Sequence, residues 1–350
     1  MPSPEPRAGD VVVDVRCVQP SVTECMLMDG DDVALHDVLA DRLRSGPVQF
    51  GGHEFAGVVG RVGADVRDVR LGQRVTAVES APCGDCGACR KNRVDSCARP
   101  SVLGFTGPGA FAEQVVVPAS SVVPLPDSVS FSAGAAVQPL AGAVHAHAAL
   151  GVRPGESVLV IGGGVMGLLA VAVARLGNAA LIALATRSER KLQIGREFGG
   201  DLLIDAHTDV REAALRATDG AGFDVVVETA GGSESAGLAG TATIETAIHV
   251  VRRGGRVAVV SVLPSRTELP TGLMREKSIT LVHPRSGAGY YAATTSVFEH
   301  CVTLVATGRV DVERLVTHRL SGLDSIPEAL AITRDKPRYG AINPAQVSLP

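Results

Sequence analysis

The sequence lacks most of the features by which proteins bind nucleic acids or membranes. Tryptophan is absent and aromatic residues make up only 3% of the chain, so neither a base-stacking platform nor a membrane aromatic belt is expected. The 33 basic residues are slightly outnumbered by 37 acidic ones, and the formal net charge of −4 comes without a basic block. This balance argues against a nucleic acid or an anionic membrane surface as the main partner.

No segment has the character of a targeting signal or a membrane span. Residues 1–10 are proline-rich and acidic, and they lack the basic and apolar regions of a signal peptide. The longest uncharged run, residues 157–174, approaches the length of a membrane helix but contains four glycines within six residues. A buried strand, a glycine turn and a buried helix explain this run better. We therefore expect a cytoplasmic protein.

The order of strands and helices indicates an α/β protein. The 350 residues, 45% hydrophobic and 20% charged, suffice for roughly two hydrophobic cores. Valine-rich strands bounded by turn residues are predicted in the first third, at 11–15, 56–62, 74–78 and 111–117. From about residue 127 strands alternate with apolar helices, the strands being predicted at 157–161, 181–184, 202–204, 224–228 and 256–261. Such alternation is typical of a doubly wound parallel sheet with helices on both faces.

A glycine turn after the first of these alternating strands predicts a dinucleotide site. The segment Gly162-Gly-Gly164-Val165-Met166-Gly167 has the Gly-x-Gly-x-x-Gly pattern and opens a helix. In this pattern Gly162 permits the tight turn, Gly164 lets backbone N–H groups approach a pyrophosphate, and Gly167 lets helix and strand pack closely. The helix N-terminus then faces the phosphates with the positive end of its dipole.

The end of the next strand favours NADP(H) over NAD(H). An acidic residue there would hydrogen-bond the ribose 2′-hydroxyl of NAD, but the position holds Ala185, followed by Thr186 and Arg187. A hydroxyl and a guanidinium suit a 2′-phosphate, which a carboxylate would repel. The alternative is that Arg187 is an ordinary solvated residue before a helix.

Four of the seven cysteines lie close together and predict a structural zinc site, at Cys83, Cys86, Cys89 and Cys97. Four thiolates suit a closed tetrahedral site that holds a loop and has no open position for a substrate. Without a secretion signal, metal binding is favoured over disulfides. The remaining cysteines, Cys17, Cys25 and Cys301, lie in apolar segments and are expected to be small buried residues.

Taken together, these motifs resemble the zinc-containing medium-chain dehydrogenase/reductase family, in its alcohol and polyol dehydrogenase branch. The resemblance covers nearly the whole chain and rests on the cysteine lobe, the glycine turn and three further segments: Gly52-His53-Glu54-Phe55-x-Gly57, Gly109-Ala-Phe111-Ala-Glu113, and Gly308-Arg309-Val-Asp311 before Leu315-Val-Thr-His318. It implies a GroES-like catalytic domain at 1–126 with the zinc lobe at about 80–100, a Rossmann domain at 127–285, and a return to the catalytic domain at 286–350. It also implies a homodimer or homotetramer.

The chain departs from the family at the catalytic zinc. The family's cysteine and histidine ligand segments align with residues 21–26 and 52–54, and here Ser21 replaces the thiolate while His53 and Glu54 remain. The later acidic ligand becomes Gln138, and Met26 replaces a histidine of the proton relay. Serine, histidine and glutamine are a poor zinc set, because zinc is held by thiolate, imidazole and carboxylate groups. The sequence therefore argues against a catalytic zinc ion.

A second departure concerns the start of the chain. The family usually carries some twenty residues, including a strand, before a segment like Pro4-Glu-Pro6…Gly9-Asp-Val11, which begins here almost at Met1. Either the start codon is assigned late or the catalytic domain lacks an edge strand.

The function predicted from these residues is NADP(H)-dependent reduction of a small molecule. Without a Lewis acid the acceptor is expected to be already activated: an enone, an iminium ion, a quinone or an activated ketone. Thr23, at the family's proton-relay position, and His53 are candidate proton donors, with Glu54 beside them. Each also has a structural alternative, a backbone cap for Thr23 and a hydrogen-bonded structural histidine for His53. Two other functions stay open: a zinc alcohol or polyol dehydrogenase with unusual ligands, and a non-redox scaffold that keeps the fold.

Overall fold

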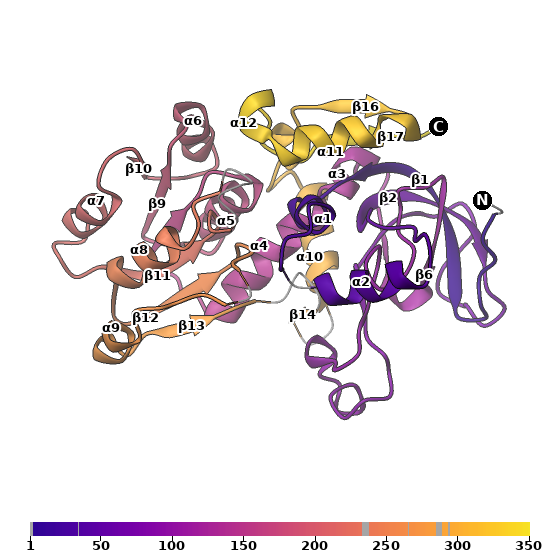
Figure 1. Ribbon diagram of the computed structural model, residues 1–350, viewed down its shortest axis with the longest axis horizontal. Helices are drawn as coiled ribbons and strands as arrows, with labels where there is room; N and C mark the ends of the chain where they lie inside the picture. The colour runs from indigo at the N-terminus through magenta and orange to yellow at the C-terminus, as the bar shows by residue number, and fades with distance from the viewer. Residues whose placement is uncertain (1–2, 34, 233–237, 265, 285–288, 293–294) are drawn as a thin grey trace. The chain divides into compact units, whose positions relative to one another are not determined.

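The chain folds into two compact units. The computed structural model describes residues 3–350 except 34, 233–237, 265, 285–288 and 293–294 (Figure 1). Unit 1 consists of Met1–Ala141 and Gly287–Pro350, and unit 2 of Gly142–Ser286. This division falls between Ala141 and Gly142, within helix α4 (Val137–Leu150), whereas the sequence predicts a domain boundary at 126/127. The second expected boundary, at 285/286, lies outside the described residues.

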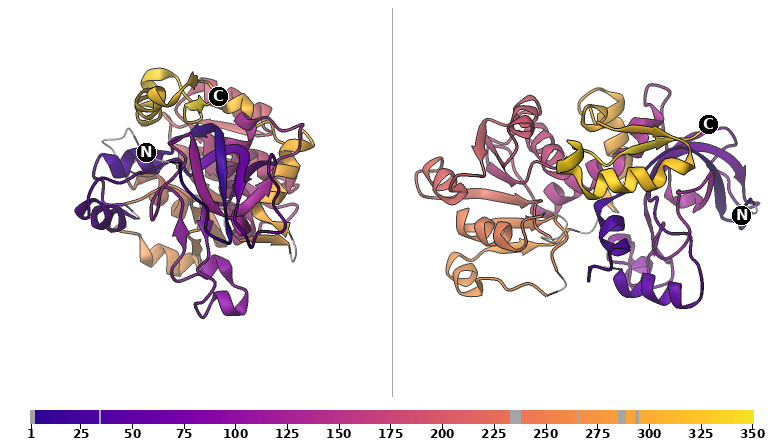
Figure 2. Two further views of the ribbon diagram at one scale, coloured as in Figure 1. Left: turned by 90° about the vertical axis from the view of Figure 1, so that its right-hand side faces the viewer. Right: turned by 45° about the horizontal axis from the view of Figure 1, so that its top comes forward.

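Unit 1 is built on a seven-stranded sheet in the order β16-β17-β1-β2-β3-β7, with β6 also paired to β1. The strands of this unit are β1 (Asp10–Gln19), β2 (Glu54–Val62), β3 (Arg74–Ala77), β4 (Ser80–Ala81), β5 (Ser101–Val102), β6 (Gln114–Pro118), β7 (Val122–Pro124), β14 (Tyr290–Ala292), β15 (Thr295–Ser296), β16 (Arg319–Ser321) and β17 (Gln346–Ser348). The pairing of β1 with β17 brings the C-terminal segment back to the first strand, as Figure 2 shows.

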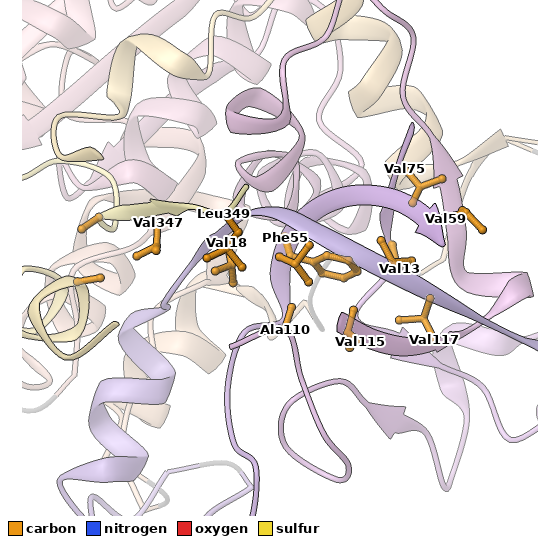
Figure 3. Close-up of a cluster of buried hydrophobic side chains, with 14 of the residues drawn as sticks. Val13, Val18, Phe55, Val59, Val75, Ala110, Val115, Val117, Val347 and Leu349 are labelled. Carbon is orange, nitrogen blue, oxygen red and sulfur yellow. The ribbon is translucent and has the colours of Figure 1, made fainter. Parts of the chain in front are cut away.

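Valine side chains from both ends of the chain fill the core of unit 1. Val13, Phe55, Val115 and Val347 are each at most 2% exposed and gather on one side of the sheet (Figure 3). The helices of this unit are α1 (Val22–Met28), α2 (His36–Arg44), α3 (Phe131–Ala135), α10 (Val297–Ala306), α11 (Ile326–Arg334) and α12 (Lys336–Tyr339). Burial of this apolar surface anchors β1 and β2, the strands whose ends carry the candidate catalytic residues.

Unit 2 is a six-stranded parallel sheet in the order β10-β9-β8-β11-β12-β13. Its elements are β8 (Ser157–Ile161), α5 (Val165–Leu176), β9 (Leu181–Thr186), α6 (Glu189–Glu197), β10 (Leu202–Asp205), α7 (Val210–Arg216), β11 (Phe223–Glu228), α8 (Ala242–Val250), β12 (Val251–Val259), α9 (Thr271–Lys277) and β13 (Thr280–Val282). Helices α5 and α6 pack together, and α7 and α9 each pack against α8. This arrangement confirms the predicted α/β class with a doubly wound parallel sheet.

The apolar run at 157–174 is a strand, a turn and a helix. Val158, Leu159 and Val160 of β8 are fully buried because helices cover a parallel sheet on both faces. Within the part of the chain that the structure describes, no helix has the length and apolar character needed to cross a membrane.

Candidate functional site

The four clustered cysteines converge in unit 1 in the geometry of a zinc site. The Sγ atoms of Cys86 and Cys89 are 3.4 Å apart and those of Cys83 and Cys97 are 3.5 Å apart, and all four lie within 4.8 Å of one another. Tetrahedral zinc with bonds of about 2.3 Å to sulfur requires separations of about 3.8 Å. The seven cysteines, all described, form no disulfide. These residues therefore fit a structural zinc ion.

Backbone amides in the cysteine lobe favour the thiolate form of two of the four clustered cysteines, Cys86 and Cys97. N–H groups of Ala98 and Cys89 directed at Cys86 lower the pKa of its thiol to about 6. The backbone N–H of Cys83 lies 3.3 Å from Sγ of Cys97 and lowers the pKa of that thiol. The pKa values of the other two clustered thiols are raised, that of Cys83 by its hydrogen bond with Asp85 and that of Cys89 by burial. Burial also raises the pKa values of Cys17, Cys25 and Cys301.

The glycine turn of unit 2 has the shape of a dinucleotide cradle. Gly162 adopts φ +113°, and a Cβ at Gly167 would lie 1.8 Å from the carbonyl oxygen of Gly162, so both positions require glycine. A Cβ at Gly164 would meet no atom within 4 Å, which leaves space for a ligand against the backbone. Val165 and Met166 open α5, whose N-terminus receives no side-chain cap. The uncapped N–H groups fit a pyrophosphate.

A positively charged cluster follows β9 beside the glycine turn. Thr186 ends β9 and is 9% exposed, and its hydroxyl would lie 2.7 Å from a Cβ built at Gly163. Arg187 follows it and is exposed. Burial lowers the pKa of Lys191, and the charges of Arg187 and Arg190 lower it further, which places three cations together. Lys191 was not predicted from the sequence, because it lies in the first turn of α6 and not at the end of β9.

A buried ion pair between His53 and Glu24 forms the centre of the candidate catalytic site in unit 1. Nδ1 of His53 lies 2.8 Å from Oε1 of Glu24, and the two side chains are 8% and 0% exposed. The Glu24 carboxylate also accepts hydrogen bonds from the backbone N–H groups of Gly52 and Ser21, each at 2.7 Å. Held by three donors, Glu24 sets the orientation of the imidazole.

Local structure explains how Glu24 and His53 meet. Ser21 caps α1, and its Oγ accepts a hydrogen bond from the backbone N–H of Glu24 at 3.1 Å while the Glu24 carboxylate returns to the backbone of Ser21. Gly52, with φ +81°, turns the chain before β2, and a Cβ there would lie 2.4 Å from the backbone nitrogen of Phe111. Sequence reasoning missed Glu24, although the Ser-x-x-Glu spacing of a capping box was a usable signal.

Neutral side chains from distant segments hold the second carboxylate, Glu54. Its Oε1 lies 3.6 Å from Nε2 of His53, and its Oε2 accepts a hydrogen bond from Nε2 of Gln19. Oε1 of Gln19 in turn accepts hydrogen bonds from the amides of Asn343 and Gln346, each at 2.8 Å. Nothing in the sequence indicated this series of hydrogen bonds, because Gln19 and Gln346 are 327 residues apart.

The surrounding carboxylates keep the His53 imidazole protonated at neutral pH. Burial by itself lowers the pKa of His53, but the carboxylates of Glu24, Glu54 and Glu79 outweigh it and raise the pKa to about 9. Burial raises the pKa of Glu54 to about 7 against the opposing charge of His53 and the hydrogen bond from Gln19. The site therefore contains a buried imidazolium, which is a proton donor.

The residues aligned with the family's catalytic zinc ligands do not fit a zinc ion. The Ser21 hydroxyl caps α1, and both nitrogens of His53 face carboxylates. Gln138 is half-buried in the first turn of α4, and Thr23 is half-buried on α1 beside Glu24; neither is among the residues that hydrogen-bond His53. Among the described histidine, cysteine and acidic residues, only the four-cysteine group converges for a metal.

Comparisons with known proteins agree with this architecture. Residues 7–127 match the family described as alcohol dehydrogenase GroES-like domain, and residues 165–305 match that described as zinc-binding dehydrogenase. Sorbitol dehydrogenase from Bacillus subtilis is 31% identical over 276 residues, which cover 77% of this chain and 73% of that protein. L-threonine 3-dehydrogenase from Pyrococcus abyssi is 28% identical over 333 residues, covering 95% and 90%.

A solved structure is similar over both units. A putative zinc-binding dehydrogenase from Sinorhizobium meliloti 1021, bound to NADP, is 29% identical with a TM-score of 0.80, covering 99% of this chain and 93% of that one.

Proposed function

Because this chain belongs to the zinc-type medium-chain dehydrogenase/reductase family, in its alcohol and polyol dehydrogenase-like branch, we propose that it is an NADP(H)-dependent reductase without a catalytic zinc. It transfers hydride to an activated acceptor: an enone, an iminium ion or an activated ketone. The observation that carries the proposal is the buried His53–Glu24 pair, with Nδ1 of His53 2.8 Å from Oε1 of Glu24, at the position where the family binds its catalytic metal.

His53 supplies the proton that balances reduction of a ketone or an enone. NADPH, when bound, supplies the hydride. As hydride adds to the electrophilic carbon, the π-electron pair moves to the oxygen or the α-carbon, and that atom takes the proton from Nε2 of His53. Glu24 holds Nδ1 and stabilises the imidazolium before transfer, and solvent restores the proton afterwards. An iminium acceptor needs no such proton, because its π pair becomes the nitrogen lone pair.

The residues around the glycine turn support NADP(H) as the cofactor. Arg187 and Lys191 offer positive charge for a 2′-phosphate, and Ala185 stands where a carboxylate would bind NAD. The NADP-bound relative from Sinorhizobium meliloti supports the same choice.

The competing function is a zinc-dependent alcohol or polyol dehydrogenase, which the sorbitol and threonine dehydrogenase relatives favour. Metal analysis of the purified chain separates the two functions. About one zinc per chain supports the reductase, because among the residues that the structure describes only the four-cysteine group converges in a way that could hold a metal. Two zinc ions per chain would overturn the proposal.

The direct test is turnover of NADPH with a panel of enones, iminium ions and activated ketones. We expect His53→Gln to lower kcat/KM for enones and ketones by about 10²–10⁴-fold, the usual contribution of a general acid. Thr23→Val is the matched comparison: a loss there with an unaffected His53→Gln variant would transfer the donor role to Thr23. No turnover with any acceptor would favour a non-redox scaffold.

A further inference from the structure

Glu79 is a buried carboxylate without a partner. The residue is 3% exposed, and neither Oε1 nor Oε2 has a hydrogen-bond partner among the described residues. The two neighbouring acids differ from it, because Glu24 accepts three hydrogen bonds and Glu54 accepts one from Gln19. A buried carboxylate is costly unless it is paired, and Glu79 shares the charge of His53 with Glu24 and Glu54 but receives no hydrogen bond from it. This side chain therefore has an unmet requirement for a hydrogen-bond donor.

The backbone places Glu79 beside the candidate catalytic site. Glu79 immediately precedes β4, and its carbonyl oxygen accepts a hydrogen bond from the backbone N–H of Leu103 at 2.8 Å. Two residues further, the Phe105 ring lies with its centroid 5.0 Å from that of His53 and 5.6 Å from that of Phe50. The Glu79 charge also acts on His53, whose pKa it helps to raise. Glu79, Phe105 and Phe50 thus come from three separate segments that meet near the imidazole.

The chemistry of these groups favours an organic cation over a metal ion. A metal would need several donor atoms around one point, and Glu79 joins no group of described histidine, cysteine or acidic residues that converges in this way. A buried carboxylate without a hydrogen-bond donor, in a site that also contains aromatic rings, instead suits an ammonium group, since a carboxylate binds such a cation by a charged hydrogen bond and a ring face attracts it by cation–π interaction.

We propose that Glu79 binds a cationic nitrogen of the substrate. The acceptor is then a ketone or an enone that carries an ammonium group, with its oxygen toward His53 and its nitrogen toward Glu79. This inference rests on the proposed function for the reacting group, but the cation site itself is tested by binding alone.

The experiment compares two ketones of the same shape on the full-length protein without NADPH. 1-(Dimethylamino)propan-2-one is cationic when protonated, and 4-methylpentan-2-one has a CH in place of its NH⁺. Calorimetric titration should show the amino ketone binding at least about ten-fold more tightly, as for a charged hydrogen bond. Glu79→Gln should reduce this preference to below about two-fold. The exposed Glu113→Gln variant is the control and should keep it.

Several outcomes would overturn the inference. Equal affinity of the wild-type protein for the two ketones would do so, as would a preference that survives in Glu79→Gln. A Zn²⁺ or Mg²⁺ ion that binds the wild-type protein but not Glu79→Gln would identify a metal site instead. Should Glu79→Gln fail to fold, choline must weaken amino ketone binding to the wild-type protein more than its neutral analogue 3,3-dimethylbutan-1-ol. Preferential binding without NADPH turnover would support the cation site and reject the reductase.

Discussion

Glu24 and His53 are 29 residues apart in the sequence, yet Oε1 of Glu24 lies 2.8 Å from Nδ1 of His53. The same oxygen accepts a hydrogen bond from the backbone N–H of Gly52, the residue before His53. One carboxylate therefore fixes both the charge of the imidazole and the turn that presents it. A hydroxyl cap on α1 and a left-handed glycine before β2 are the local features that bring the pair together.

Glu24→Gln should change how stability depends on pH. The pKa of His53 is raised from 6.5 to about 9, so the ion pair contributes fully below pH 6.5 and its contribution is lost as pH rises through about 9. Urea unfolding should show the wild-type protein losing stability over this window and Glu24→Gln losing less. His36→Gln, which removes a partly exposed histidine, should follow the wild-type curve. Parallel curves for wild type and Glu24→Gln would contradict the assignment.

Arg187→Ala and Lys191→Ala should weaken NADP(H) binding. Each removes a charge offered to the 2′-phosphate, and the loss should be about 1–3 kcal/mol for Arg187, as for a charged hydrogen bond. NADPH and NADH fluorescence titrations check this, and the NADH affinity should change less. Arg216→Ala, on α7 and paired with Glu212, is the control. Unchanged NADPH affinity in Arg187→Ala would refute the NADP(H) assignment.

Alanine at two positions of the glycine turn should have opposite consequences. At Gly164 a Cβ meets open space, so Gly164→Ala should keep the melting temperature but reduce NADPH affinity by crowding the pyrophosphate. At Gly167 a Cβ meets the carbonyl oxygen of Gly162 at 1.8 Å, so Gly167→Ala should lower the melting temperature. Thermal unfolding and NADPH titration distinguish the two. Full NADPH affinity in Gly164→Ala would place the phosphates elsewhere.

Removal of zinc should open the cysteine lobe. Arg90, Lys91 and Arg93 are exposed between the second pair of predicted ligands, Cys89 and Cys97. Chelation, or Cys97→Ser, should bring the zinc content near zero and make this segment a preferred site of trypsin cleavage, because four thiolates no longer share a metal. Cys301→Ala, a buried cysteine outside the lobe, should retain the zinc. A protein without zinc that resists trypsin equally well would contradict a structural metal.

Features formed by residues close together in the chain could be predicted from the sequence. The Gly-x-Gly-x-x-Gly segment lies between β8 and α5 as predicted, and Gly162 and Gly167 have the conformation and close contact that require glycine. The four cysteines converge because their short spacing within one loop restricts where the thiols can go. The fold class was predictable for the same reason, since strand and helix periodicities are local properties.

Contacts between residues far apart in the chain could not be predicted in this way. Gln19 meets Asn343 and Gln346 only because β17 pairs with β1 at the far end of the chain. Glu79 belongs to no sequence motif. Its importance comes from the burial of its carboxylate without a hydrogen-bond partner, which is a property of the folded molecule.

The sequence by itself determined the family, the α/β class, the cysteine lobe and the glycine turn, because each depends on residues close together in the chain. It also predicts that Ser21 and Gln138 stand at the positions of the family's zinc ligands. Only the tertiary structure decided what occupies that place. Folding brings the carboxylates of Glu24 on α1, Glu54 in β2 and Glu79 after β3 to a single imidazole, and their combined charge outweighs the effect of burial on its pKa.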